Sequence, residues 1–207
     1  MFNNQAIPAD LDAKMDKRVK LKLFTTLQDS GYHQCPACEN TASLVKNLHR
    51  ATGKIEYEEI SILDDPQTAL RYHVQRAPTI IVQGHGIRYT GAPIGLETAP
   101  FVHTLVMAST GKTIFGNLLD NIAPKLRRAR LELLVTPTCP YCSQAVLIEN
   151  SLVMSSAGRL TIDVVETYEN PDIARRYNVT GVPVTVIDGK DQITGVPTMQ
   201  ALLSRLS

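Results

Sequence analysis

Four cysteines are the residues of this chain whose spacing points most directly to chemistry. They form two pairs, Cys35 with Cys38 and Cys139 with Cys142, and in each pair proline directly follows the first cysteine. A CxxC pair brings two thiols close enough to form a local disulfide or to ligate one metal ion. The chemistry to consider is therefore thiol redox exchange or metal binding.

A zinc or iron–sulfur site built from both pairs is the first alternative. Zinc ribbons separate their two pairs by about 15–20 residues, whereas Cys139 follows Cys38 by 101 positions. Inert buried cysteines are a second alternative, but core packing gives no reason to repeat CxxC with proline inside it. Redox chemistry is favoured, and a metal-binding protein with Cys ligands is kept as the alternative of another class.

The redox interpretation has a physical mechanism. Each first cysteine is expected between a strand and a helix, with Pro36 and Pro140 in the first helical turn, where no hydrogen bond is lost. An exposed first cysteine would face the positive end of the helix, which lowers its pKa and favours the thiolate. The second cysteine, one turn deeper, would then resolve the mixed disulfide.

The chain contains an internal repeat with an offset of 104 or 105 residues. Six residues downstream of the first pair recur downstream of the second, and a Thr-Gly-x-Pro segment follows in both copies. The matching residues are Pro66, Ala69, Arg71, Tyr72, Val74 and Pro78 in the first copy, and Pro171, Ala174, Arg176, Tyr177, Val179 and Pro183 in the second. We therefore expect two domains of one fold, at residues 1–118 and 119–207.

Each copy shows the same predicted order of elements, βαβαββα. Apolar or alternating runs predict strands, and a helix is expected from each CxxC pair to about residue 49 or residue 154. A short helix precedes the shared proline, a turn separates the last two strands, and a helix closes each copy, from about Glu97 in the first. The predicted strands lie at 19–24, 55–60 and 79–82, and at 131–135, 161–165 and 184–187.

Composition limits the partners that we expect. Lys and Arg number 21 against 20 Asp and Glu, and hydrophobic residues make up 43%. A formal charge of +1 gives no field that would attract nucleic acid or an anionic membrane. No apolar run approaches the roughly 20 residues of a membrane-spanning helix, and the start of the sequence has no signal-peptide pattern. We therefore expect a cytoplasmic protein without nucleic-acid or membrane partners.

These motifs together resemble the thioredoxin superfamily. The repeated unit looks like thioredoxin or glutaredoxin, and the tandem resembles the two-domain protein disulfide oxidoreductases, also called glutaredoxin-like proteins, over residues 20–206. The second copy is the more specific, through residues 135–142, 163–166 and 177–183. The resemblance implies an α/β protein with two tandem thioredoxin-like folds, each a central mixed sheet flanked by helices.

The resemblance also implies the site residues. Pro78 and Pro183 occupy the position of the cis-proline beside the active-site disulfide, where they would present the backbone of Ala77 and Val182 to a bound substrate. The redox-active disulfides of the chain itself would carry the electrons, so the protein would need neither a metal nor another cofactor. The catalytic residues implied are Cys35, Cys38, Cys139 and Cys142.

The function implied is an enzyme, a thiol–disulfide oxidoreductase that acts on protein disulfides by dithiol exchange. A thioredoxin-reductase-like flavoprotein would be its electron donor. The alternative within redox chemistry is a dedicated electron-transfer protein that couples a flavoprotein reductase to a peroxidase, similar to the N-terminal domains of alkyl hydroperoxide reductase flavoproteins.

One segment and two further residues shape the expectation for each site. A long polar stretch precedes Cys35, so Cys35 is expected to be less accessible than Cys139, and Cys139 to carry most of the turnover. His33 is interpreted as a loop residue in solvent rather than as a group that stabilises a thiolate. Glu132 is interpreted as an exposed strand residue rather than as a proton acceptor for Cys142.

Overall fold

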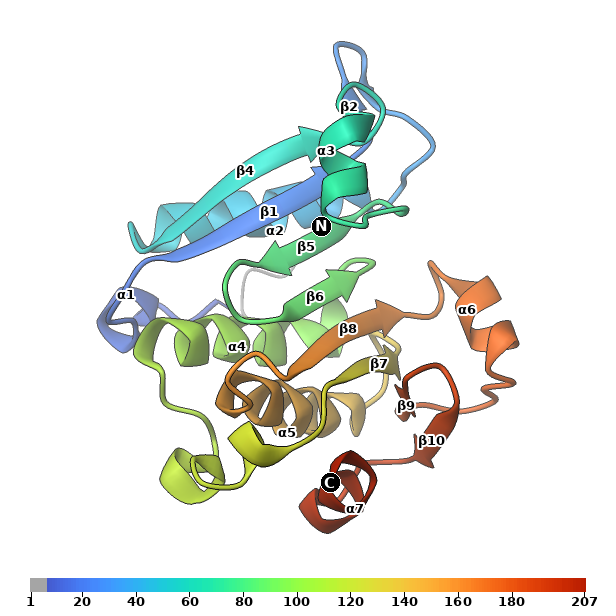
Figure 1. Cartoon of the computed structure of the whole chain (residues 1–207). Coiled ribbons are helices and arrows are strands. Elements are labelled where there is room, and N and C mark those ends of the chain that lie inside the picture. The colour runs from blue at the N-terminus through green and yellow to red at the C-terminus, as the bar shows by residue number, and fades with distance from the viewer. Residues whose placement is uncertain (1–6) are drawn as a thin grey trace.

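The computed structural model describes residues 7–207, which fold around one eight-stranded mixed sheet (Figure 1). The first repeat contains α1 (Leu11–Lys14), β1 (Val19–Thr25), β2 (Leu27–Gln28), β3 (Gly31–Tyr32), α2 (Cys38–Ala51), β4 (Ile55–Ser61), α3 (Pro66–Arg71), β5 (Thr79–Val82), β6 (Ile87–Thr90), η2 (Gly95–Glu97) and α4 (Thr98–Thr110). The connection holds η3 (Gly116–Leu119) and η4 (Ala123–Lys125). The second repeat contains β7 (Ala129–Val135), α5 (Cys142–Ser155), β8 (Leu160–Glu166), α6 (Pro171–Arg176), β9 (Val184–Ile187), β10 (Asp191–Thr194) and α7 (Met199–Leu206).

Both repeats follow the predicted order βαβαββα, and their strands lie within a residue or two of the predicted ranges. Three features were not predicted: α1, the β2–β3 hairpin and the short 3-10 helices. The hairpin is the long polar stretch before the first CxxC pair, which pairs Leu27 with Tyr32. Among the described residues, no helix is long and apolar enough to cross a membrane. The domain division at residues 118 and 119 falls inside the connection and stays a prediction.

The two repeats join head to tail in the sheet. The strand order is β4-β1-β5-β6 in the first repeat and, continuing across the sheet, β8-β7-β9-β10 in the second. The junction is a parallel pairing of β6 with β8, from Ile87 opposite Ile162 to Thr90 opposite Val165. Since β8 corresponds to β4 in the repeat, the last strand of one unit lies beside the outer strand of the next.

This order places both CxxC pairs at one edge of the sheet. The strands β1 and β7 that precede them run parallel, through the chain of pairings that connects them. Their carboxyl ends therefore meet the same edge. Three strands lie between β1 and β7, which at about 4.8 Å per strand separates the two strands by about 19 Å.

Successive side chains of each strand point to opposite faces of the sheet, and the apolar core on one face is much larger than that on the other. Leu21 and Leu23 of β1 join a large core shared by both repeats, whereas the adjacent Phe24 joins a small cluster under α3. Helices α2, α4 and α5 cover the large core, while α3 and α6 lie on the other face, each over its own small cluster (Figure 1). The large core includes residues of both repeats, so the repeats share one interior.

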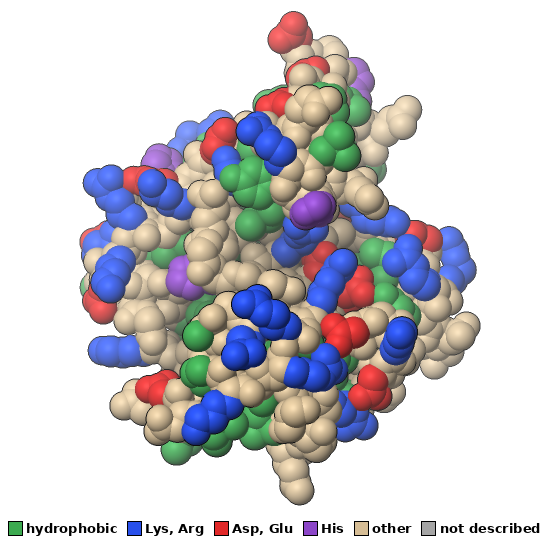
Figure 2. Space-filling model, in the orientation of Figure 1, with side chains coloured by type: hydrophobic (Ala, Val, Ile, Leu, Met, Phe, Trp, Pro, Cys, Tyr) green, Lys and Arg blue, Asp and Glu red, His purple; other side chains and the backbone are tan. Residues whose placement is uncertain are grey.

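A groove of about 940 Å³ lies on the face between α3 and α6. Basic and acidic side chains surround this hollow together (Figure 2), among them Arg88, Arg130 and Asp163. At one wall, Arg76 donates from Nη1 to the carboxylate of Asp172 over 2.9 Å, which ties the two repeats together. The groove contains none of the cysteines.

Polar groups are also buried where helices of the two repeats meet. The amide of Asn150 on α5 donates to Tyr89 Oη and to Thr104 Oγ1, both over 2.9 Å. One helical position earlier, Glu149 is fully buried and accepts a hydrogen bond of 2.6 Å from the hydroxyl of Thr185 on β9. Its Oε2 has no hydrogen-bond partner in the described part of the chain.

The buried Glu149 predicts a pH-dependent stability. Burial raises its pKa from 4.5 to about 8, so between these values the unfolded chain ionises while the folded chain holds the proton. The free energy of unfolding should therefore fall as pH rises from about 4.5 to about 8, on the order of a few kcal/mol for this group. Denaturant titrations at both pH values should show a smaller fall in Glu149→Gln than in the wild type. An equal fall in both, or a smaller fall also in Glu39→Gln at an exposed position, would contradict this assignment.

Candidate active sites

Each CxxC pair lies in the connection between a central strand and the helix that follows it. Helices α2 and α5 begin at Cys38 and Cys142, so Pro36 and Pro140 precede the helices instead of standing in their first turn. The prolines were predicted inside the first turn, but each precedes the first helical residue by two positions. The strand-to-helix turn needs the residues between the two cysteines, and the second cysteine is itself the first helical residue.

The expectation that each first cysteine is exposed was wrong. Cys35 is 7% exposed and Cys139 is 8% exposed, while Cys38 and Cys142 are fully buried. Segments from elsewhere in the fold cover the sulfurs, and a sequence pattern cannot show this cover. The near-equal values also remove accessibility as a reason for unequal sites, because the hairpin before Cys35 leaves it no more buried than Cys139.

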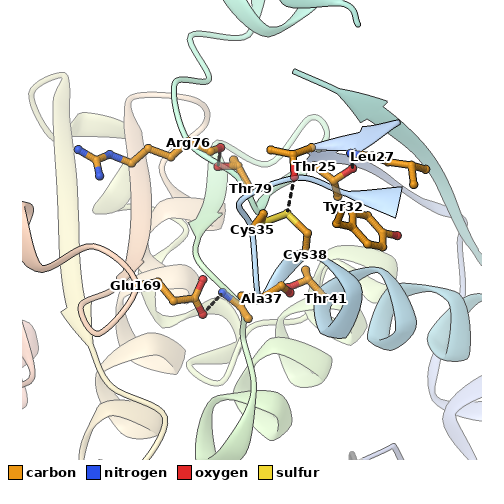
Figure 3. Close-up of a disulfide and its surroundings, with 12 residues drawn as sticks. Thr25, Leu27, Tyr32, Cys35, Ala37, Cys38, Thr41, Arg76, Thr79 and Glu169 are labelled. Carbon is orange, nitrogen blue, oxygen red and sulfur yellow. Dashed lines mark hydrogen bonds between the residues drawn. A yellow bond between two sulfur atoms is a disulfide. The ribbon is translucent and has the colours of Figure 1, made fainter. Parts of the chain in front are cut away.

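The first site holds a disulfide between Cys35 and Cys38 (Figure 3). This confirms the local pairing expected from the spacing. The hydroxyl of Thr26 contacts Cys38 Sγ at 3.9 Å. Beside it, Tyr32 of the β2–β3 hairpin donates to the carboxylate of Glu59 at the end of β4 over 3.1 Å, so the hairpin is fixed at the β4 side of the site.

The second site holds two free thiols. The backbone N–H of Cys142 donates to Cys139 Sγ over 3.3 Å, and Cys139 donates to the carbonyl of Val182 over 3.6 Å. A donor at the start of a helix stabilises a thiolate at this sulfur. The carbonyl of Val182 therefore lies directly against the first cysteine.

Pro78 and Pro183 follow cis peptide bonds, which confirms the prediction for both. The two segments are held in the same way. The N–H of Gly91 donates to the carbonyl of Pro78 over 2.9 Å, and that of Gly195 donates to Pro183 over 2.8 Å. The Thr-Gly-x-Pro segments that repeat in the sequence thus support the proline of each site.

The first repeat also reaches into the second site. The N–H of Leu96 in η2 donates to the carbonyl of Pro137 over 2.8 Å, and the hydroxyl of Ser143 donates to the carbonyl of Leu96 over 2.9 Å. Gly95 has a φ of +62°, and a Cβ there would lie 2.5 Å from the carbonyl oxygen of Pro137. Only glycine permits this close approach.

Glu97 is a functional candidate that the sequence did not indicate. It is 2% exposed, and neither carboxylate oxygen has a hydrogen-bond partner among the described residues. Burial raises its pKa to about 8, and the charge of Glu166 adds to the shift. In the sequence it looks like an ordinary acidic residue at the start of a helix, and only the tertiary structure places it beside the second site.

The thiol of Cys142 responds electrostatically to Glu97. The pKa of Cys142 is raised well above its usual range, mainly by burial, then by its hydrogen bond to Cys139, with the charge of Glu97 contributing. A resolving thiol in such a place needs a group that removes its proton. Glu97 is a buried carboxyl group available for that purpose.

Glu132 and His33 were both predicted to be exposed, and the structure confirms this for His33 alone. Glu132 was expected to be exposed, but it is 8% exposed and its carboxylate accepts a hydrogen bond of 2.6 Å from Tyr177. Glu132 is buried because α6 and the following Tyr177 pack over this part of β7. Tyr177 lies on the α6 face of the sheet, whereas Cys142 belongs to the large core on the opposite face. His33 is exposed as expected and lies 2.9 Å from the hydroxyl of Ser30.

The structure does not bring the four cysteines together. The two pairs follow strands about 19 Å apart, which is too far for one tetrahedral metal site. Within residues 7–207, no group of three or more His, Cys, Asp or Glu side chains is arranged to hold a metal ion. The metal-binding alternative therefore has no support from this geometry.

Known proteins share this fold and this sequence pattern. A family model described as a thioredoxin domain matches residues 129–207. A probable thioredoxin of Archaeoglobus fulgidus is 40% identical over 68 residues, which cover 32% of this chain and 74% of that protein.

Two solved structures cover almost the whole chain. A protein disulfide oxidoreductase from Aeropyrum pernix K1 superposes with a TM-score of 0.86 and 27% identity, over 96% of this chain and 88% of that one. A component of the alkylhydroperoxide reductase of Enterococcus faecalis superposes with a TM-score of 0.84 and 21% identity, over 98% and 96% of the two chains. At that identity the second likeness concerns the fold alone. The chain therefore belongs to the thioredoxin superfamily and is a thiol–disulfide oxidoreductase.

Proposed function

We propose that both CxxC pairs exchange electrons with protein disulfides, each as an independent dithiol site. The observation that carries this proposal is the geometry of the second site, where Cys139 Sγ accepts the N–H of Cys142 and faces the carbonyl of Val182. The sulfur lies where a donor favours its thiolate, and its resolving partner is three residues away.

In the reducing direction, the Cys139 thiolate attacks one sulfur of the substrate disulfide. The substrate S–S bond breaks, the departing sulfur takes a proton from solvent, and a mixed disulfide forms. Cys142 then loses its proton and attacks Cys139 Sγ, which releases the second substrate thiolate. Two electrons pass to the substrate, and the site becomes a disulfide.

Glu97 is proposed as the acceptor of the Cys142 proton. Its carboxyl group is buried, has no hydrogen-bond partner in the described structure, and acts electrostatically on the thiol. In the reverse direction, a protonated Glu97 returns the proton as the disulfide is reduced. The described part of the first site has no comparable unpartnered buried carboxyl group.

Substrate would align along the segments before the two cis-prolines. In the second site the carbonyl of Val182 accepts the Cys139 thiol, so a substrate cysteine bound at that sulfur lies beside the Val182 backbone. Ala77 has the equivalent position before Pro78 in the first site. We include Ala77, Pro78, Val182 and Pro183 in the substrate-binding surface on this basis.

The two sites act separately in this proposal. A distance of about 19 Å between the strands that carry them is several times the length of a disulfide, so one site cannot exchange directly with the other within the rigid sheet. Each site would be reduced and oxidised by its own encounters.

The electron donor proposed is a thioredoxin-reductase-like flavoprotein, because the four cysteines of this chain supply only dithiol chemistry. The protein itself would need no bound cofactor. The likeness in fold to the alkylhydroperoxide reductase component favours the second candidate function, electron transfer from a flavoprotein to a peroxidase. We also propose a cytoplasmic location, where reductants would keep the sites turning over, and cell fractionation would test it.

The purified protein is expected to catalyse dithiothreitol-dependent reduction of insulin, because its two dithiols reach protein disulfides from one edge of the sheet. The measurement is the rate of insulin precipitation with and without the protein. Peptide mapping after oxidation should find Cys35 joined to Cys38 and Cys139 to Cys142. A rate equal to that of dithiothreitol alone would contradict the proposed function. Turnover confined to a peroxidase substrate would favour the second candidate.

A further inference from the structure

The head-to-tail sheet makes the surroundings of the two sites different. The segment after β6 of the first repeat runs beside β8 and reaches the second site, because β6 pairs with β8. The equivalent segment of the second repeat follows β10, which is an outer strand of the sheet. The second site therefore receives this segment of the first repeat, whereas the second repeat reaches the surroundings of the first site through a different segment, in which Glu169 is bonded to Ala92 and Asp172 to Arg76.

This segment, residues 91–97, is anchored on both repeats. The N–H of Gly91 donates to Pro78 of its own repeat, while the N–H of Ala92 donates to the carboxylate of Glu169 in the second repeat over 3.1 Å (Figure 3). Further along, the backbone of Leu96 makes its two hydrogen bonds to Pro137 and Ser143, on either side of the CxxC pair. The segment is thus held at one end by Pro78 and Glu169 and fixed at the other end, through Leu96, against the second site.

The side chain of Leu96, unlike its backbone, is open to solvent. It is 48% exposed although both of its backbone groups are bonded within the site. Tyr141, between the two cysteines of the same site, is 65% exposed. Cys139 itself is only 8% exposed, so a partner must lie on the surrounding surface to reach its sulfur.

We propose that Leu96 of the first repeat forms part of the substrate-binding surface of the second CxxC site, where it contacts an apolar side chain near the reacting cysteine of a protein substrate. This inference rests on the proposed function of that site. A Leu side chain fixed by its own backbone offers apolar area at low entropic cost. A small disulfide reaches Cys139 without covering Leu96, so the contact distinguishes protein substrates from small ones.

The test uses the full chain with Cys35→Ser and Cys38→Ser, so that only the second site turns over. In this parent, Leu96→Glu should raise KM for insulin about fivefold to tenfold, the loss expected from one apolar contact, with a much smaller change in kcat. With 2-hydroxyethyl disulfide as substrate, the effect should stay below about twofold. Leu118→Glu is the matched control, at a leucine of η3 that is 76% exposed and away from both sites.

Each outcome has a distinct meaning. An unchanged KM for insulin in Leu96→Glu, or an equal rise in Leu118→Glu, would overturn the proposed contact. An equal loss with 2-hydroxyethyl disulfide would also overturn it, since Leu96 would then support the loop rather than bind substrate. A parent without turnover on either substrate would instead contradict the proposed function of the second site.

Discussion

Cys139→Ser is expected to remove a larger share of the insulin-reducing activity than Cys35→Ser. Accessibility does not favour either sulfur, since the two are almost equally buried. The difference lies in the proton acceptor, because the buried carboxyl group of Glu97 acts electrostatically on Cys142, whereas the described residues around the first site include no unpartnered buried carboxyl group. A site that removes the proton of its resolving thiol completes each cycle faster.

The measurement compares the two single variants in the same insulin assay. Cys35→Ser should keep most of the wild-type rate, and Cys139→Ser should keep the smaller part. If Cys139→Ser instead keeps most of the activity while Cys35→Ser loses it, the ranking of the sites is wrong.

Glu97→Gln should slow resolution of the mixed disulfide at the second site, on the order of 10²-fold for loss of a general base. Because the pKa of Glu97 is about 8, the wild-type rate of this step should rise as pH increases through about 8 and the carboxyl group ionises. Glutamine has no such ionisation, so the rise should be lost. Single-turnover release of a thiol from a preformed mixed disulfide at Cys139 measures this step directly.

Two matched variants separate proton transfer from a change in packing. Glu149→Gln removes another buried carboxyl group whose pKa is about 8, but one bonded to Thr185, and should leave the pH profile unchanged. Glu97→Asp should restore part of the rate together with the pH dependence. A pH profile in Glu97→Gln identical to that of the wild type would exclude Glu97 as the proton acceptor.

The sequence predicted the features that depend on local pattern. The spacing of the cysteines, the prolines at Pro78 and Pro183, and the offset between the copies indicated the repeated fold and the place of each site. Alternating apolar residues predicted the strands to within a residue or two. These features depend on residues that are close together in the sequence. Because the repeat contains each of them twice, they are easier to recognise.

The features that were missed depend on how the repeats meet. Apart from Gly95, nothing near Glu97 or Leu96 in the sequence indicates the second site, because their approach to it requires the pairing of β6 with β8. The burial of Glu132 and of both first cysteines likewise depends on packing from other elements. Gly95 is the one local signal that could have helped, since glycine before a helix can mark a close backbone approach.

The central claim is that the two CxxC pairs carry the thiol–disulfide exchange. The most direct measurement is the rate of dithiothreitol-dependent insulin reduction by the double variant Cys35→Ser/Cys139→Ser, beside the wild type and the two single variants. The double variant should fall to the rate of dithiothreitol alone, while each single variant keeps a measurable part. A double variant that keeps the wild-type rate would contradict the claim.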